Sequence, residues 1–527
     1  MSTYDDASLI MFPSGYKEDK IYSLKPTDGS GDLTFTRASS ATRVNAEGLI
    51  ETASILGTEL ISSTLINSNY DTFNEASVSG FHAIYSTSGT QRAATLDEIS
   101  FVTGKTYQVN IDVSVVSGSE PFLRAREAIA TSPTIFSGQL VAGNNLITFT
   151  SANTLTGILE FSSTTASEYR VSNVSVKEVI TNNVPRIDYT SGCGKLLLEP
   201  QRTNIITYSN SNSLNFALDN VSMSYNSVIS PDGTTNGILF KQTGTSNSNS
   251  AYNYGLTTAD GTYTYSIFLK ASDSESIRIY SSNGAATLTQ DFNPQTMTDG
   301  ILAGSLNLNF QDYGNGWFRM SFARTLSSAA NHRLSIYPDR NNTQKGLYIY
   351  GIQVEVSSFP TSYIPTTSGT AVTRVVDDYS LSNIRTNGLI SASGGSWLVH
   401  ITNNESRIRD AGGGGLYLNE SDAFNGSNGV RIGQTSTGLS QLKVVIYLSG
   451  VATTFNLTDE EIKVAFSWNG TTLDLWVNGT KEIDAMAFTF TDMEFLGSNL
   501  DVSYIVQNEL IFPTALSDAD AIALTTL

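Results

Sequence analysis

Strict alternation of apolar and polar residues is the feature of this sequence that most limits its fold. In residues 107–115 (YQVNIDVSV) every second side chain is apolar, as in a β-strand that buries one face. Residues 169–179 (YRVSNVSVKEV) form another alternating stretch. Gly, Ser, Thr and Asn are plentiful elsewhere, as in chains made of many short strands and turns. We therefore predict an all-β, multidomain chain built from sandwiches.

Both alternating stretches have a second copy further along the chain. Residues 263–271 (YTYSIFLKA) correspond to the first stretch, so that Tyr263 takes the place of Tyr107. Residues 348–356 (YIYGIQVEV) correspond to the second stretch. Each Tyr strand is also followed by a similar tetrapeptide, SGSE in one copy and SDSE in the other.

Two copies at this spacing indicate duplicated domains, because the units of a solenoid would be shorter. We place the first module at residues 57–180 and the second at residues 206–360. Both resemble jelly-roll carbohydrate-binding modules, and the resemblance implies two jelly-roll β-sandwiches. It extends to the fold and has little support from sequence motifs.

Residues 184–204 (VPRIDYTSGCGKLLLEPQRTN) contain two short apolar runs around a glycine-rich turn, and Pro200 ends the second run. Alone they would predict an ordinary β-hairpin between two domains. Together with residues 35–45 (FTRASSATRVN) and 47–51 (EGLIE), they resemble a motif pair of tailed-bacteriophage virion proteins. In those relatives the two halves usually lie nearly adjacent in sequence, whereas about 130 residues separate them here. The first jelly-roll module is therefore expected to be an insertion.

The insertion predicts one small β unit split between two parts of the chain. Residues 1–56 would hold an N-terminal arm and its first half, and residues 181–205 its second half. The halves should meet in space, with residues 43–51 pairing as strands with residues 186–198. The sequence leaves open whether residues 8–22 dock on a neighbouring molecule.

The last part of the chain is predicted to be a connector, residues 361–390, followed by a final domain, residues 391–527. Residues 462–479 (IKVAFSWNGTTLDLWVNG) indicate a hairpin, since an Asn-Gly pair separates two strand-like runs. The domain resembles the concanavalin A-like (laminin-G-like) sandwich. Such domains often end in a short capped helix, and Ser517 is the expected N-cap here.

The chain is strongly acidic, with a formal net charge of −19 and a pI near 4.6. Nucleic acids and anionic membranes are therefore disfavoured as partners, because both bind basic surfaces. Cys193, the single cysteine, has no partner for an internal disulfide and is expected to pack as a small hydrophobe. The N-terminus lacks the features of a signal peptide, and no apolar run reaches the ~20 residues of a membrane span. We expect synthesis in a bacterial cytoplasm.

Catalytic motifs are absent from the sequence. It contains no Gly-x-Ser-x-Gly elbow, phosphate-binding loop or His-Glu-x-x-His helix, and no Glu-x-Asp-x-x-Glu strand like that of concanavalin A-like glycosidases. His82, His332 and His400 lie far apart and are expected to be structural. Hydrolases of other designs take carboxylates from distant strands, so an enzyme stays an alternative.

The predicted hairpin of the last domain holds the best candidates for glycan binding. Leu473, Leu475 and Val477 alternate to one face, which leaves Asp474 and Trp476 on the other. The indole could stack on a sugar ring while the carboxylate accepts hydrogen bonds from its hydroxyls. The competing interpretation is that another strand or subunit covers Trp476, since large aromatic side chains are mostly buried.

Trp317, which follows Gly316, is a third glycan-binding candidate, with a place in the core as its alternative. No cofactor is expected. Jelly-roll modules of this kind often carry a structural calcium ion on carboxylate and carbonyl oxygens. Asp291, Asp377 and Asp378 are residues of that type, but no loop shows ligand spacing, so the sequence assigns no metal site.

The resemblance implies a non-enzymatic structural protein of a tailed-phage virion, a fibre, spike or decoration of the head or tail. Its lectin-like domains would bind glycans of the host or another surface. The alternatives are a polysaccharide depolymerase and a purely architectural subunit without glycan binding. Expected partners are other virion proteins, cell-surface glycans and further copies of the chain, with a homotrimer favoured.

Overall fold

The computed structural model describes residues 3–527 with the following exceptions: 62–65, 68–75, 79–80, 87–90, 96–97, 129–132, 210–213, 215, 247–249, 258–259, 283–286, 298–305, 327–330, 392, 403–413, 423–427, 434–441, 449–450, 489–492 and 501–502. The chain divides into two compact units. One unit comprises Met1–Ala53 together with Asn182–Leu527, and the other is Ser54–Thr181. We call the second one the inserted unit.

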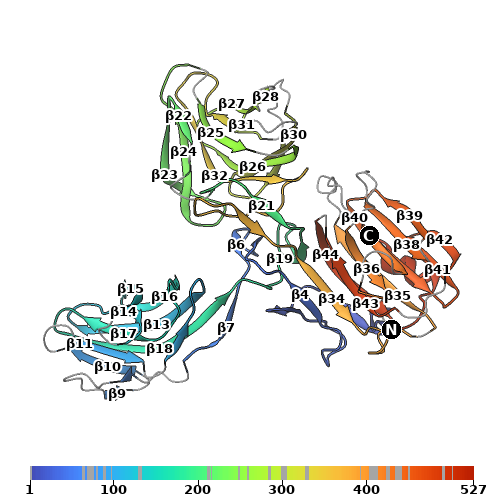
Figure 1. Cartoon of the computed structure of the whole chain (residues 1–527), viewed down its shortest axis with the longest axis horizontal. Helices are drawn as coiled ribbons and strands as arrows, with labels where there is room; N and C mark the ends of the chain where they lie inside the picture. The colour runs from blue at the N-terminus through green and yellow to red at the C-terminus, as the bar shows by residue number, and fades with distance from the viewer. Residues whose placement is uncertain are drawn as a thin grey trace. The chain divides into compact units, whose positions relative to one another are not determined.

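The protein is an all-β, multidomain chain of sandwiches, as the sequence predicts (Figure 1). Among the described residues, helix is limited to η1 (Thr3–Asp6) and α1 (Asp518–Thr525). Ser517 caps α1 as predicted, because its side chain accepts a hydrogen bond from the Asp520 amide. No helix of the described part is long and apolar enough to cross a membrane.

The inserted unit is a sandwich of two antiparallel sheets, which we call the first sandwich (Figure 1). One sheet has the order β16-β13-β18-β10-β9, with β7 also on β18, and the other has the order β15-β14-β17-β11-β8, with β12 also on β17. Alternate residues of β13, including Tyr107, Val109 and Ile111, fill the core between them. The strands are β7 (Ile55–Glu59), β8 (Ile66–Asn67), β9 (Ala76–Val78), β10 (Phe81–Ser86), β11 (Gln91–Thr95), β12 (Ile99–Phe101), β13 (Thr106–Ser117), β14 (Phe122–Arg126), β15 (Thr134–Gln139), β16 (Gly143–Thr150), β17 (Leu155–Ser163) and β18 (Ser167–Ile180).

The second sandwich has sheets of order β23-β24-β32-β26-β30-β29 and β22-β25-β31-β27-β28. Its core includes Tyr263, Tyr265 and Ile267 of β26. The strands are β22 (Ala217–Asp219), β23 (Val221–Ile229), β24 (Thr235–Gln242), β25 (Ser250–Thr257), β26 (Gly261–Ala271), β27 (Ile277–Ser282), β28 (Thr287–Phe292), β29 (Asn309–Asp312), β30 (Trp317–Leu326), β31 (Asn331–Tyr337) and β32 (Gly346–Val356).

The two sandwiches have the same strand order. Strand β13 lies between β16 and β18, just as β26 lies between β30 and β32, and the second sandwich adds β29 at the edge beyond β30. Even one irregularity recurs. The ladder of β13 and β18 shifts register between Asn110 and Asp112, opposite Asn173 with φ 51°, and that of β26 and β32 shifts between Ser266 and Phe268, opposite Gly351 with φ 54°. A bulge at one position in both ladders supports a common origin.

The C-terminal sandwich recruits strands from distant parts of the chain. One sheet has the order β19-β20-β44-β35-β40-β41-β42, with β1 also on β44, and the other has the order β2-β3-β4-β34-β43-β36-β37-β38-β39. The N-terminal segment is therefore part of this sandwich, since Leu9–Met11 pairs with β44 of the same chain. The strands from the N-terminal and motif regions are β1 (Leu9–Met11), β2 (Tyr16–Lys17), β3 (Lys20–Ile21), β4 (Leu33–Thr36), β19 (Ile187–Asp188) and β20 (Lys195–Leu198). The others are β34 (Asp378–Ser382), β35 (Gly395–Thr402), β36 (Gly415–Asn419), β37 (Gly429–Gly433), β38 (Leu442–Leu448), β39 (Val451–Leu457), β40 (Glu461–Trp468), β41 (Thr472–Val477), β42 (Thr480–Ala487), β43 (Phe495–Asn499) and β44 (Tyr504–Phe512).

The two motif halves lie side by side, but the predicted strand pairing between them is wrong. Strand β5 (Thr42–Val44) pairs with β6 (Ile50–Thr52), and β19 pairs with β20, which joins the C-terminal sandwich through β44. The halves meet instead through single bonds, such as the one from the Tyr189 amide to the Val44 carbonyl at 3.0 Å. The predicted connector also forms strands, because β33 (Val372–Arg374) pairs with β21 (Arg202–Asn204) and β34 lies inside a sheet. The strands of the two motif halves do not pair with one another. The two halves are therefore connected by side chains of the motifs and by single backbone hydrogen bonds.

Candidate functional site

The polar residues of the motif segments converge on one buried cluster of charges. Arg186 donates from Nη1 to Glu199 Oε2 at 2.8 Å and pairs through Nη2 with Asp377. Arg37 Nη1 lies 2.9 Å from Asp377 Oδ1, and Arg374 Nη1 lies 2.8 Å from Glu199 Oε2. All five side chains have no solvent exposure. We call them the buried charge cluster.

The backbone of the same segments completes the cluster. The Glu199 amide donates to Asp377 Oδ2 at 2.9 Å, and the Asp377 amide returns a bond to the Glu199 carbonyl at 3.0 Å. Ser362 donates to both Glu199 oxygens, from its amide at 2.8 Å and from its hydroxyl at 2.6 Å. Buried carboxylates need such additional donors, because ion pairing alone seldom offsets the loss of hydration.

The pKa values of the three arginines in the cluster shift in different directions. Burial lowers the pKa of Arg37 to about 10, and it also lowers the pKa of Arg374. Burial acts in the same direction on Arg186, but Asp377 and Glu199 outweigh it and raise the pKa of that guanidinium. Arg186, which contacts both carboxylates, is therefore the centre of the cluster.

Other charged residues of the motifs form ion pairs and hydrogen bonds outside the buried charge cluster. Arg43 and Glu51 form an ion pair at 2.9 Å on the β5–β6 hairpin. Asp188 accepts hydrogen bonds from the Val44 amide at 2.8 Å and the Thr190 amide at 3.0 Å, and so ties the second motif half to the first. The charged residues of the motifs thus have structural partners.

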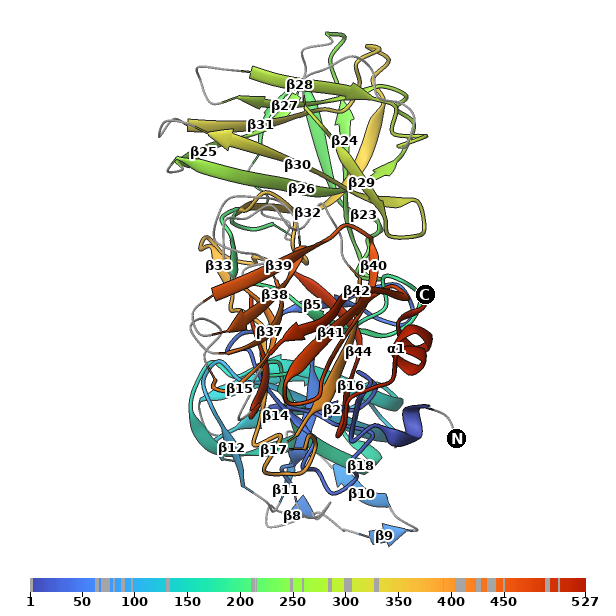
Figure 2. The ribbon, with the colours of Figure 1, turned by 90° about the vertical axis from the view of Figure 1, so that its right-hand side faces the viewer.

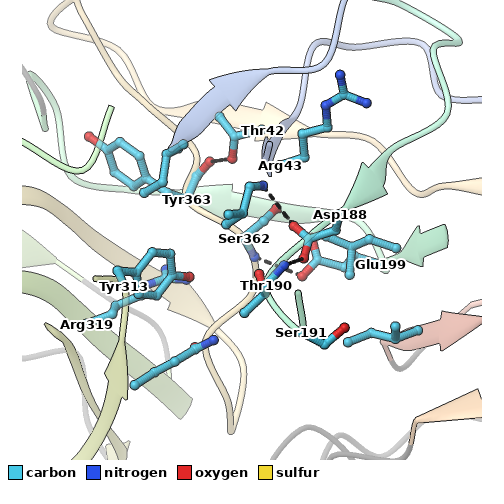
Figure 3. Close-up of a pocket in the computed structure, with 15 residues that line it drawn as sticks. Thr42, Arg43, Asp188, Thr190, Ser191, Glu199, Tyr313, Arg319, Ser362 and Tyr363 are labelled. Carbon is cyan, nitrogen blue, oxygen red and sulfur yellow. Dashed lines mark hydrogen bonds between the residues drawn. The ribbon is translucent and has the colours of Figure 1, made fainter. Parts of the chain in front are cut away.

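A cavity of about 140 Å³ lies beside the buried charge cluster (Figure 3). Its lining comes from both motif halves, from the second sandwich and from residues 361–390, the predicted connector. In that segment the Tyr363 carbonyl accepts a hydrogen bond from Thr42 Oγ1 at 2.5 Å. It is smaller than the ~300–1,000 Å³ of typical ligand pockets. The lining residues labelled in Figure 3 are Thr42, Arg43, Asp188, Thr190, Ser191, Glu199, Tyr313, Arg319, Ser362 and Tyr363.

Both carboxylates that line the cavity are committed to holding the fold together. Each oxygen of Asp188 accepts a backbone N–H, and each oxygen of Glu199 accepts from Ser362. A general acid or base must be able to reach the proton that it exchanges with a substrate. The oxygens of these two carboxylates are instead engaged by the hydrogen bonds just described. Among the described residues, no group of three His, Cys, Asp or Glu side chains is placed to hold a metal ion.

Trp476 is buried, so its predicted exposure is wrong. The alternation of β41 holds, since Leu473 and Leu475 face the main core while the indole points away from it. A second layer covers that face, and α1 belongs to it (Figure 2). No sugar can stack on this fully covered ring. The buried apolar residues that share a cluster with Trp476 are Ala7, Leu398, Ala465, Leu510, Phe512, Ala521 and Leu524.

The other two candidates have local partners. Asp474 accepts a bond from the Ala485 amide at 2.7 Å and lies 3.4 Å from Lys481 Nζ. Trp317 is buried and donates from Nε1 to the Ile229 carbonyl at 3.0 Å. The structure thus brings neither residue together with Trp476 in an open site.

The remaining residues singled out by sequence also find places in the fold. His400 Nε2 lies 2.8 Å from Glu461 Oε1, and burial lowers the pKa of both His332 and His400. The side chain of His82 lies outside the described residues. Cys193 is exposed at the tip of its hairpin, so its expected packing is wrong.

The acidic residues considered for calcium have other surroundings. Asp377 belongs to the buried charge cluster, and Asp291 pairs with Arg278. Asp378 accepts from Ser498 Oγ at 2.6 Å, and burial raises its pKa.

Sequence reasoning missed the contributions of Ser362, Tyr363, Arg374 and Asp377, because it treated their segment as a connector. One signal was present. Residues 372–375 (VTRV) echo residues 41–44 (ATRV), and both arginine-containing segments reach the junction.

No family model and no curated protein matches this chain. Solved structures match weakly. Domain 4 of AbnA, a GH43 extracellular arabinanase from Geobacillus stearothermophilus, in complex with arabinotriose, has 10% identity and a TM-score of 0.23, covering 32% of this chain and 86% of that one. The CBM22-1–CBM22-2 tandem of Paenibacillus barcinonensis Xyn10C has 11% identity and a TM-score of 0.22, covering 58% and 98%. A Trypanosoma rangeli sialidase in complex with the inhibitor DANA has 9% identity and a TM-score of 0.22, covering 93% and 98%. At these TM-scores the likenesses carry no argument about what this chain binds.

Proposed function

We propose that the chain is a non-enzymatic structural protein of a tailed-phage virion, a fibre, spike or decoration whose sandwich domains bind glycans. One observation carries the proposal. The segments that resemble phage virion proteins supply Arg37, Arg186 and Glu199 to a single buried cluster. That cluster joins the second and C-terminal sandwiches, so the motifs act as a scaffold that presents β-sandwich domains.

The state of the cavity carboxylates favours this function over a depolymerase. Asp188 and Glu199 are held by backbone and Ser362 donors, as a structural junction requires. A depolymerase would release reducing ends from host capsule or exopolysaccharide. We expect no release by the purified chain, and release at a steady rate would replace the proposal with the enzymatic alternative.

The virion location is tested on purified phage particles with an antibody raised against the chain. We expect gold labelling at a defined position of the head or tail in electron micrographs. Absence of the chain from intact particles, by labelling and by mass spectrometry, would overturn the structural role.

Glycan binding and assembly are tested on the purified chain. A glycan array distinguishes a binding fibre or spike from a purely architectural subunit, which would retain no glycan. Light scattering should give the mass of a homo-oligomer, with a trimer favoured by closed symmetry. A monomer would mean that contacts with other virion proteins alone hold the chain in place.

A further inference from the structure

A second hollow, of about 370 Å³, lies on the outer face of the second sandwich. Its volume falls within the ~300–1,000 Å³ range of small-molecule sites. The residues that line it are mainly apolar, and Lys270 is the charged residue among them. The residues on which the argument depends are Leu49, Val228, Pro231, Lys270, Tyr313 and Trp317.

The walls of this hollow are fixed before any ligand arrives. The Ile50 amide donates to the Pro231 carbonyl at 2.8 Å, which holds the β5–β6 hairpin against the second sandwich. The Tyr313 ring lies edge-on to Phe268, with centroids 4.9 Å apart and planes at 88°. Trp317 is held by its bond from Nε1 to the backbone. A preformed hollow lowers the entropy cost of binding.

Lys270 is the charged residue of the hollow, and no hydrogen bond or ion pair joins its Nζ to a described residue. Its Cε lies 3.7 Å from the position that a Cβ on Gly316 would occupy, so the lysine stem runs along the turn before Trp317. Acidic residues outnumber basic ones by 49 to 30 in this chain, and most basic groups near the junction are paired. An ammonium that has no partner among the described residues and lies in an apolar hollow is suited to an anion brought by a ligand.

We propose that this hollow binds a carboxylated sugar residue of an acidic polysaccharide, an inference that rests on the proposed glycan-binding function. The apolar face of the sugar ring packs on Tyr313, and its carboxylate accepts a charge-assisted hydrogen bond from Lys270. Uncharged sugars of the same shape bind more weakly, because they leave the ammonium unpaired. Asn315 and Trp317 form part of the wall, and both belong to the sequence NGWFR at residues 315–319.

The test is calorimetric titration of the full chain with tetragalacturonate and with its methyl ester, which keeps the sugar rings and removes the charges. We expect the acid to bind at least about tenfold more tightly than the ester. Lys270→Met should remove that preference, and Lys270→Arg should keep most of it. Lys241→Met, a change of an exposed lysine in the same sheet, is the matched control and should bind like the parent chain.

A second measurement uses the unaltered protein, in case the Lys270 variants do not fold. Tetragalacturonate should protect Lys270 from reductive methylation several-fold more than its ester does, as read by mass spectrometry. Equal binding of acid and ester, or no protection of Lys270, would overturn the carboxylate inference while leaving glycan binding intact. Failure to bind any sugar of an array would overturn both this inference and the glycan-binding part of the proposed function.

Discussion

The first and second sandwiches share a strand order and a bulge, yet they use the outer face of the same sheet differently. In the second sandwich this face is covered by its own chain. Ser266, Gln353 and Glu355 are fully buried, and Glu355 Oε1 accepts a bond from the Thr361 amide at 2.8 Å. In the first sandwich the corresponding side chains remain accessible to solvent. Asp112 accepts bonds from Asn144 at 2.8 Å and Asn173 at 2.6 Å, on an exposed polar surface.

The same sheet face therefore serves two purposes within a common architecture. Where the second sandwich has Phe268 and Gly351, the first has Asp112 and Asn173. An apolar side chain beside a glycine lets Tyr363 pack closely on the sheet, whereas an Asp–Asn pair satisfies its polar groups locally and stays hydrated. The covered face joins domains within the larger unit, and the corresponding face of the first sandwich stays hydrated.

The largest effect is expected from breaking the buried charge cluster, whose five residues all belong to the larger unit. Arg186→Met leaves the fully buried Asp377 and Glu199 with fewer partners, so unfolding should become easier by ~3–5 kcal/mol. Chemical denaturation should show the loss in the transition of the larger unit alone. The control is Lys105→Met, which removes an exposed ion pair with Glu178 from the inserted unit and should cost under about 1 kcal/mol. An unchanged larger unit would contradict the importance of the cluster.

The next effect is a pH response confined to the larger unit. Burial raises the pKa of Glu509, whose Oε1 accepts from Tyr379 at 2.5 Å between the two sheets, from 4.5 to about 7. The carboxyl loses its proton at a lower pH in the unfolded chain than in the folded one. The folded state should therefore lose ~3 kcal/mol of stability as pH rises from about 4.5 to about 7.

Glu509→Gln isolates that contribution, because it should flatten the pH dependence over the same range. His332 and His400, whose pKa values burial lowers, act in the opposite sense below pH 6.5 in both proteins and cancel in the difference. The inserted unit supplies the contrast. Hydrogen bonds from Asn144 and Asn173 lower the pKa of Asp112, so its contribution is lost only as pH falls below about 3.8. Parallel pH curves for the parent and the variant would refute the assignment.

A smaller effect compares the two bulges directly. In Gly351→Ala the new Cβ would lie 3.0 Å from Tyr363 Cζ at a φ of +54°, so strain and overpacking should cost ~2–3 kcal/mol. Asn173 is exposed, so Asn173→Ala should cost ~1 kcal/mol through the loss of its hydrogen bond to Asp112. Equal losses of free energy in urea melts of the two variants would mean that the covered face does not constrain its bulge.

The smallest effect is expected from removing the inserted unit. The residues that flank the inserted unit are held by the rest of the larger unit. The Ala53 amide donates to the Ala41 carbonyl at 2.9 Å, and the Asn183 amide donates to the Arg37 carbonyl at 2.8 Å. No described residue of 54–181 contributes to the cores of the larger unit. Deletion with a short Gly-Ser linker should leave one cooperative transition within a few degrees of the parent. Its disappearance would show that the insertion supports the rest of the chain.

Local features of this protein could be predicted from the order of its residues. Alternation with a period of two predicts strands and tells which side chains share a face, and it did so for β13, β26 and β41. The capped helix was predictable because Ser517 acts on an amide three residues away. The resemblance of the motif segments also indicated that residues 43–51 and 186–198 would meet.

The residues that cover each face could not be predicted in this way, because they come from distant segments. Alternation placed Trp476 away from the aliphatic core, but its cover comes from Ala7 at one end of the chain and Leu524 at the other. Likewise, the ion partner of Arg186 and Arg37 is Asp377, which lies 191 residues from one and 340 from the other. Local patterns carry no information about such partners, because burial and ion pairing depend on contacts between segments that only the complete fold brings together.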